Sequence, residues 1–108
     1  MYMKIKVKDY EYTIIEVDEN DSDFYKNGDL KLYGQARFVD QIIKIYKDLS
    51  PIRKRQTLIH ELTHVFIDVY LSAQAQRNKY QEEDICCFIA TYSEDILCIV
   101  DKYFNKEV

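Results

Sequence analysis

The first half of the chain alternates apolar and polar residues with the period of two that is typical of β-strands. Within residues 1–48 this pattern occurs in "MKIKVK", "YEYTIIEV", "LKLYGQARFVD" and "QIIKIYKD". A polar stretch at 18–29 follows the second segment, and its Asn27-Gly28 pair is typical of a tight turn. Gly34, inside the third segment, indicates a bulge or a close backbone approach. The pattern predicts three to four strands.

The second half has the longer period of helices. Ser50 and Pro51 predict a helix start, with Ser50 as the N-cap, and the helical pattern continues from 50 to about 72. A polar loop then leads to a second long helix at about 81–105. Strands followed by helices predict one α+β domain over 1–108, in which an antiparallel or mixed sheet packs beside two helices.

The first of these helices has apolar residues on two sides. One stripe at helical spacing should face the sheet, and it consists of Leu58, Leu62, Val65, Phe66 and Val69. His60 and His64 lie on nearly the opposite side, together with Ile67 and Leu71. We therefore expect the two histidines to point away from the sheet.

These are the only two histidines of the chain, and with Glu61 they form the pattern His-Glu-x-x-His. One helical turn separates the imidazoles by about 6 Å along the axis, close enough for both to bind one zinc ion. Glu61 projects to one side, where a carboxylate can act as a general base without binding the metal. The alternative is a pair of core histidines that bind no metal. Two histidines at i and i+4 around a glutamate favour zinc.

A catalytic zinc ion needs a third protein ligand and an open position. No histidine remains, so this ligand has to be a carboxylate or a cysteine. The longer zinc motif with Gly at 67 and His at 70 is excluded by Ile67 and Tyr70. Glu82 falls on the apolar stripe of the second helix, where an unpaired carboxylate is costly. Glu82 is therefore the predicted third ligand, and Glu83 is the fallback.

That stripe comprises Ile85, Phe88, Ile89, Tyr92, Ile96, Ile99, Val100 and Tyr103. Cys86 follows Glu82 by one turn, and it either supports the site or packs as a small apolar residue. Asp68 follows His64 by one turn, and it either orients a histidine or is solvated. Tyr80 and Tyr92 are both candidates for assisting catalysis, and the sequence does not choose between them.

The net charge, the targeting and membrane patterns and the cysteines narrow the expected class of protein. The net charge of −4 argues against nucleic-acid binding as the main task, since phosphate contacts need clustered Lys and Arg. The basic cluster Arg53, Lys54 and Arg55 is short, and we expect a solvated first helical turn. The sequence has no signal-peptide pattern and no apolar run that could span a bilayer. Three cysteines fit a reducing cytosol, so we expect a cytoplasmic location.

Three segments, "LYGQARFVDQIIKI", "TLIHELTH" and "EEDICCFIATY", resemble the ImmA/IrrE-like metallopeptidases, especially short phage and prophage members. In that family a helix of pattern E-x-x-A-[ND]-x-F-A follows the zinc motif, and its Glu is the third ligand. Aligning Phe88 with the Phe of the pattern places Cys86 at the Asn/Asp and Glu82 at the ligand. The resemblance implies a small zincin-like fold of the gluzincin type and, for some members, regulated cleavage of a repressor.

The expected function is that of a zinc-dependent endopeptidase of narrow specificity. Its substrate would be a protein or peptide, and the family resemblance implies a phage-type repressor. An extended substrate would pair with an edge strand, for which "IIKIYK" is the candidate. The alternative is a weakly active or inactive zinc-binding module that sequesters a regulatory protein.

Overall fold

A four-stranded mixed sheet forms one layer of the structure. The computed structural model describes residues 2–71 and 82–105, and for Glu82 the backbone alone. The strands of the sheet are β1 (Tyr2–Val7), β2 (Tyr10–Val17), β5 (Gly34–Arg37) and β6 (Ile42–Tyr46). Their order is β1-β2-β6-β5, so β1 and β5 are the edges. The predicted α+β class is confirmed, and of the antiparallel or mixed sheet of three to four strands that was expected, the mixed sheet of four strands is present.

One pair of neighbouring strands is parallel. β2 runs parallel to β6, with Ile14 opposite Ile43, whereas β1 with β2 and β5 with β6 are antiparallel. Strands that are consecutive in the chain are therefore not all neighbours in this sheet. The chain leaves β2, passes β5 at the edge and returns into the sheet as β6. Parallel pairing needs such a long connection, because a tight turn can join only antiparallel strands.

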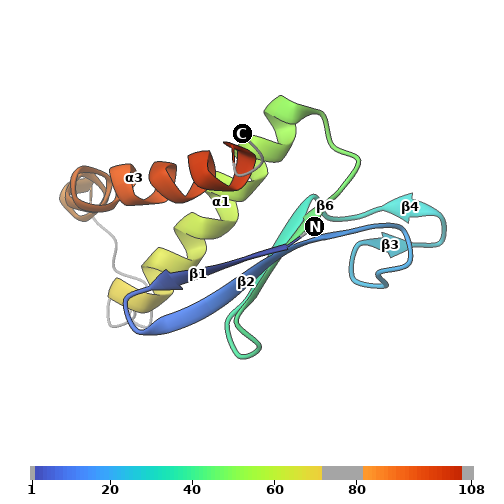
Figure 1. Ribbon diagram of the computed structural model, residues 1–108, viewed down its shortest axis with the longest axis horizontal. Coiled ribbons are helices and arrows are strands. Elements are labelled where there is room, and N and C mark those ends of the chain that lie inside the picture. The colour runs from blue at the N-terminus through green and yellow to red at the C-terminus, as the bar shows by residue number, and fades with distance from the viewer. Residues whose placement is uncertain (1, 72–81, 106–108) are drawn as a thin grey trace.

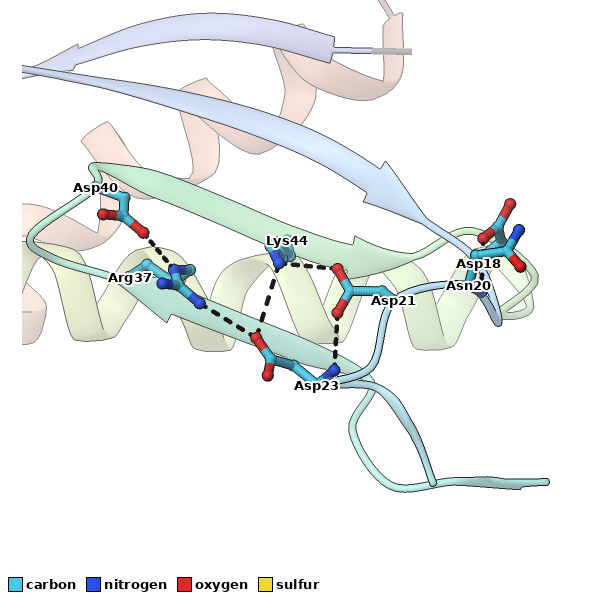
Figure 2. A network of polar contacts seen from close by, with 7 residues as sticks. All are labelled: Asp18, Asn20, Asp21, Asp23, Arg37, Asp40 and Lys44. Atoms are coloured by element: carbon cyan, nitrogen blue, oxygen red, sulfur yellow. Dashed lines mark hydrogen bonds and ion pairs between the residues drawn. The ribbon is translucent and has the colours of Figure 1, made fainter. Parts of the chain in front are cut away.

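The connection contains a small hairpin of β3 (Tyr25–Lys26) and β4 (Asp29–Leu30). Asn27 and Gly28 form its turn with positive φ values of 56° and 82°, as the Asn-Gly pair predicts. Before the hairpin, Asp21 accepts a hydrogen bond of 2.8 Å from Lys44 on β6. Figure 2 shows this contact, together with the ion pair between Arg37 and Asp23, in front of the sheet. These contacts hold the connection between β2 and β6 against the sheet face opposite the helices.

Both helices lie on the other face of the sheet. They are α1 (Pro51–Tyr70) and α3 (Glu82–Asn105). α1 packs on β5, β6 and β1, and α3 packs against α1 (Figure 1). No helix within the described residues is long and apolar enough to cross a lipid bilayer.

α1 begins and packs as its sequence predicts. The Ser50 hydroxyl accepts a hydrogen bond of 3.3 Å from the Arg53 N–H, and Pro51 follows it in the first turn. The predicted stripe faces the sheet, since four of its five residues are buried: Leu58, Leu62, Val65 and Phe66. Fixing this stripe also fixes the opposite side of α1, where the histidines lie.

The stripe predicted for α3 is correct for most of its length. Phe88, Ile96, Val100 and Tyr103 are buried, but Ile85 and Ile89 are 52% and 55% exposed. Both isoleucines line an open groove between α3 and α1, so the two helices do not close on each other there. The phase of a helix identifies its apolar side, but the crossing of two helices decides how much of that side is covered.

Glu16 of β2 connects the sheet to both helices. Its carboxylate accepts a hydrogen bond of 3.0 Å from Lys54 Nζ of α1 and another from the Tyr103 hydroxyl of α3. Burial of Glu16 works to raise the pKa of its carboxyl, but the hydrogen bonds from Tyr103 and Lys54 outweigh it and hold this pKa below its ordinary value. The carboxylate therefore remains charged and helps to hold α3 against the sheet.

Candidate metal centre

α1 presents both histidines on its open side. His60 and His64 are exposed, and their Nε2 atoms lie 3.2 Å apart. The two rings meet edge to face, with centroids 4.8 Å apart. One helical turn separates the two residues, so their side chains converge on the same point in front of the helix.

The separation of these nitrogens fits one shared metal ion. Two imidazole nitrogens that bind one zinc ion in tetrahedral geometry, each at about 2.0–2.1 Å, lie about 3.3–3.4 Å apart. Potential ligand atoms of His60, Glu61 and His64 all lie within 4.8 Å of one another, and no other such group of three occurs among the described side chains. The donor atoms are of the kind that zinc prefers, so His60 and His64 would hold it.

Glu61 is the buried member of this group. Only 10% of its side chain is exposed, and its Oε2 atom lies 4.0 Å from His60 Nε2. Burial raises the pKa of the Glu61 carboxyl, and the two histidines together with the N–H of Ala36 oppose this shift. A carboxylate whose proton affinity is raised in this way is better suited to accept a proton in a reaction.

Gly34 allows β5 to approach α1 at this point. A methyl group at residue 34 would lie 2.6 Å from Cγ2 of Thr57 and 2.9 Å from Cγ of Glu61. These distances are shorter than real Cβ atoms show, so any side chain here would force its neighbours or the strand to move. Of the bulge and the close approach that the sequence left open, the close approach is present. The contact places the edge strand β5 beside Glu61.

A polar cleft of about 290 Å³ lies between β5 and α1. His60 and Glu61 line it, together with Tyr33, Gly34, Arg53, Gln56 and Thr57. Three residues of this cleft were not predicted from the sequence as part of the site: Tyr33, Arg53 and Gln56. A signal was present for two of them, because Arg53 and Gln56 precede His60 by two turns and one turn on the same side of the helix.

An apolar groove of about 550 Å³ lies on the other side of the histidines, between α1 and α3. The residues that line it include Ile59, Thr63, Ile67 and Leu71 of α1 and Ile85 and Ile89 of α3. The histidine side of α1 therefore lies between a polar cleft and an apolar groove.

The predicted third ligand remains a prediction. Glu82 is the first residue of α3, and its side chain lies outside the described residues. Glu83 is exposed, and its carboxylate accepts a hydrogen bond of 3.7 Å from Cys87 Sγ within α3. Among the described side chains, the group around the histidines contains Glu61 and no residue of α3.

The supporting residues considered from sequence lie elsewhere. Cys86 is a free, exposed thiol and so is not a core residue. Asp68 is exposed, and no hydrogen bond joins it to a histidine in the described part of the chain. Tyr92 stacks on Tyr70 at 4.4 Å in an aromatic cluster between the helices, and not in the polar cleft. Tyr80 lies outside the described residues.

A mixed sheet with His-Glu-x-x-His on the helix that packs against it is typical of metallopeptidase-type domains. The family model of the IrrE N-terminal-like domain, a peptidase family designated M78, matches residues 11–92, and the chain belongs to this family. The matched range includes β2, the cleft, α1 and the first half of α3. Searches of curated proteins and of solved structures found no significant match.

Proposed function

We propose that this protein is a zinc-dependent endopeptidase of narrow specificity that cleaves a partner protein. The observation that carries the proposal is the separation of 3.2 Å between the two Nε2 atoms, with the buried Glu61 beside them. The family resemblance nominates a phage-type repressor as the substrate. A cytoplasmic location is part of the same proposal.

His60 and His64 would hold the zinc ion, with Glu82 as the proposed third ligand. Bound zinc would act as a Lewis acid on the scissile carbonyl group. Glu61 accepts a proton from the attacking water molecule and later donates it to the leaving nitrogen. The backbone of Ala36 favours the charged form of the Glu61 carboxyl and so opposes the rise of its pKa.

An extended substrate would bind along β5. The strand "IIKIYK" was the candidate from sequence, but this choice is wrong, because β6 pairs with β2 on one side and with β5 on the other. β5 is the edge strand next to α1, and at Gly34 it touches the residues around Glu61. An extended peptide that adds to this edge would pass the histidines.

Two substitutions test the proposal. Zinc per chain is measured by elemental analysis, and we expect a stoichiometric amount in the wild type and its loss in His60→Ala. Glu61→Gln should retain zinc and lower the rate of peptide cleavage by about 10²–10⁴-fold, since it removes the general base. A wild type that binds no zinc when refolded with it, or a Glu61→Gln variant that cleaves at the wild-type rate, would refute the proposal.

A second function is a zinc-binding module that holds a regulatory protein without cutting it. The apolar groove of about 550 Å³ beside the histidines favours it, because exposed apolar surface is common where proteins bind one another. A partner that binds wild type and Glu61→Gln equally and stays intact with both would support this alternative. A partner that is cut by the wild type alone would support the peptidase.

A further inference from the structure

The three basic residues at the start of α1 do not have the same surroundings. Lys54 pairs with Glu16 at 3.0 Å, and Arg55 pairs with Asp101 at 2.9 Å. Two residues of the first turn that we expected to be solvated are thus engaged in ion pairs, although the pair of Arg55 with Asp101 is exposed. Arg53 instead places its guanidinium group over the ring of Tyr33, 5.4 Å from the ring centroid. No carboxylate among the described residues pairs with Arg53.

Arg53 and Tyr33 belong to the cleft that contains His60 and Glu61. On α1, Arg53 precedes His60 by two turns, which corresponds to about 10.5 Å along the helix axis. An extended peptide advances by about 3.3 Å per residue. A substrate strand beside α1 would therefore bring a residue two to four positions from the scissile bond to the guanidinium group.

The contact with Tyr33 holds the guanidinium group of Arg53 where it can bind an anion. A ring face attracts the flat guanidinium group and limits its motion, while its N–H donors at the edge remain available. A carboxylate can accept two of these hydrogen bonds at once, and such charge-assisted pairs are stronger than neutral ones. The chain as a whole carries a net charge of −4, so this attraction is local and suits a single carboxylate better than an acidic polymer.

We propose that Arg53, held by Tyr33, is a specificity residue that binds a substrate carboxylate two to four residues from the scissile bond. The carboxylate belongs either to an Asp or Glu side chain or to the C-terminus of the peptide. This inference rests on the proposed peptidase function. Arg53 does not touch the reacting atoms, so it acts on substrate choice and leaves the bond-breaking step unchanged.

The cleavage test uses peptides that differ at one position. A set of decapeptides carries Asp or Asn at each position in turn, with either a free or an amidated C-terminus, and kcat and KM are measured for the zinc-loaded enzyme. We expect Asp to be preferred at one position two to four residues from the cut by about 10-fold or more. Arg53→Gln should abolish this preference by raising KM for the Asp peptide while leaving the Asn peptide unchanged. A preference that follows the free C-terminus instead identifies the terminal carboxylate as the ligand.

The matched control is Arg55→Gln, which removes the same charge two residues away and should keep the preference for Asp. Binding is measured separately with zinc-loaded Glu61→Gln, by fluorescence anisotropy of the same labelled peptides. If no peptide is cut but the acidic peptides still bind more tightly through Arg53, the peptidase proposal fails, and Arg53 is supported as a carboxylate-binding residue of the cleft without a cleavage position. The inference would be overturned if acidic and neutral peptides bind equally or if neither binds. It would also be overturned if Arg53→Gln lowers the affinity for both kinds of peptide equally.

Discussion

Two carboxylates, Glu16 of β2 and Glu61 of α1, are withdrawn from solvent, and their surroundings differ. The side chain of Glu16 is 14% exposed, and it accepts hydrogen bonds from Lys54 and Tyr103. The side chain of Glu61 is 10% exposed, and no Lys or Arg forms an ion pair with it among the described residues. Burial acts on both carboxyls, but the pKa of Glu16 is lowered by its partners and the pKa of Glu61 is raised.

The difference separates a carboxylate that stabilises the fold from one that is available for chemistry. The charge of Glu16 is compensated within the protein, so ionisation of Glu16 favours the folded state. The charge of Glu61 is compensated only in part, so its ionisation is costly unless a cation binds nearby. A metal ion between the histidines would supply that cation. The predictions below test this contrast with matched substitutions.

The largest expected effect is the loss of stability in Glu16→Gln. The substitution weakens two hydrogen bonds to a charged group, and we expect the free energy of unfolding to fall by about 2–3 kcal/mol in urea titrations. Glu11→Gln is the control, because Glu11 lies on the same strand and forms an exposed ion pair of 3.9 Å with Lys4. That control should lose about 0.5 kcal/mol or less. Similar losses in both variants would contradict a structural role for Glu16.

The contribution of Glu16 should also depend on pH. Its pKa in the folded protein lies below the ordinary value of 4.5, so the stabilisation is fully present above about pH 4.5 and is lost as the pH falls through the folded pKa. Denaturation of the wild type and Glu16→Gln is compared between pH 7 and pH 3. The difference in their unfolding free energies should shrink over the acidic part of this range. A constant difference would mean that the charge of Glu16 is not its cause.

Gly34→Ala should disturb the packing around Glu61. The added methyl group would meet Thr57 and Glu61 at 2.6 Å and 2.9 Å, and we expect a loss of about 1–2 kcal/mol because the strand has to move. Thr57→Ser in the same chain removes the methyl group at the shorter contact and should recover part of the loss. Both quantities come from thermal and urea denaturation. Full stability of the Gly34→Ala chain would show that β5 does not need to lie this close.

The smallest expected effect has the opposite sign. In the metal-free protein, Glu61→Gln removes a buried charge but keeps an acceptor for the Ala36 N–H, so the free energy of unfolding should rise by about 0.5–1 kcal/mol. The free energy of unfolding of Glu16→Gln, measured under the same conditions, should fall. A loss of stability in both variants would show that ionisation of Glu61, like that of Glu16, favours the folded state.

Local patterns in the sequence predict much of this fold, and contacts between distant segments account for what they miss. Ser50 and the apolar stripe of α1 define its start and its buried side, which places the histidines. The parallel pairing of β2 with β6 is not visible in either strand alone, because it depends on the long connection between them.

For the site, the convergence of His60 and His64 follows from helical spacing alone. Glu16 could have been found in the same way, since it shares the inward side of β2 with Tyr12 and Ile14. Tyr33 could not, because it reaches the cleft only after the sheet has placed β5 beside α1.

The strand order has a consequence for how the protein folds. β1 with β2 and β5 with β6 can each form early as local hairpins, whereas the parallel junction of β2 and β6 has to close a long loop first. α1 spans this junction, and the hydrogen bond between Tyr103 and Glu16 joins residues 87 positions apart. We expect the docking of the two hairpins to limit the folding rate.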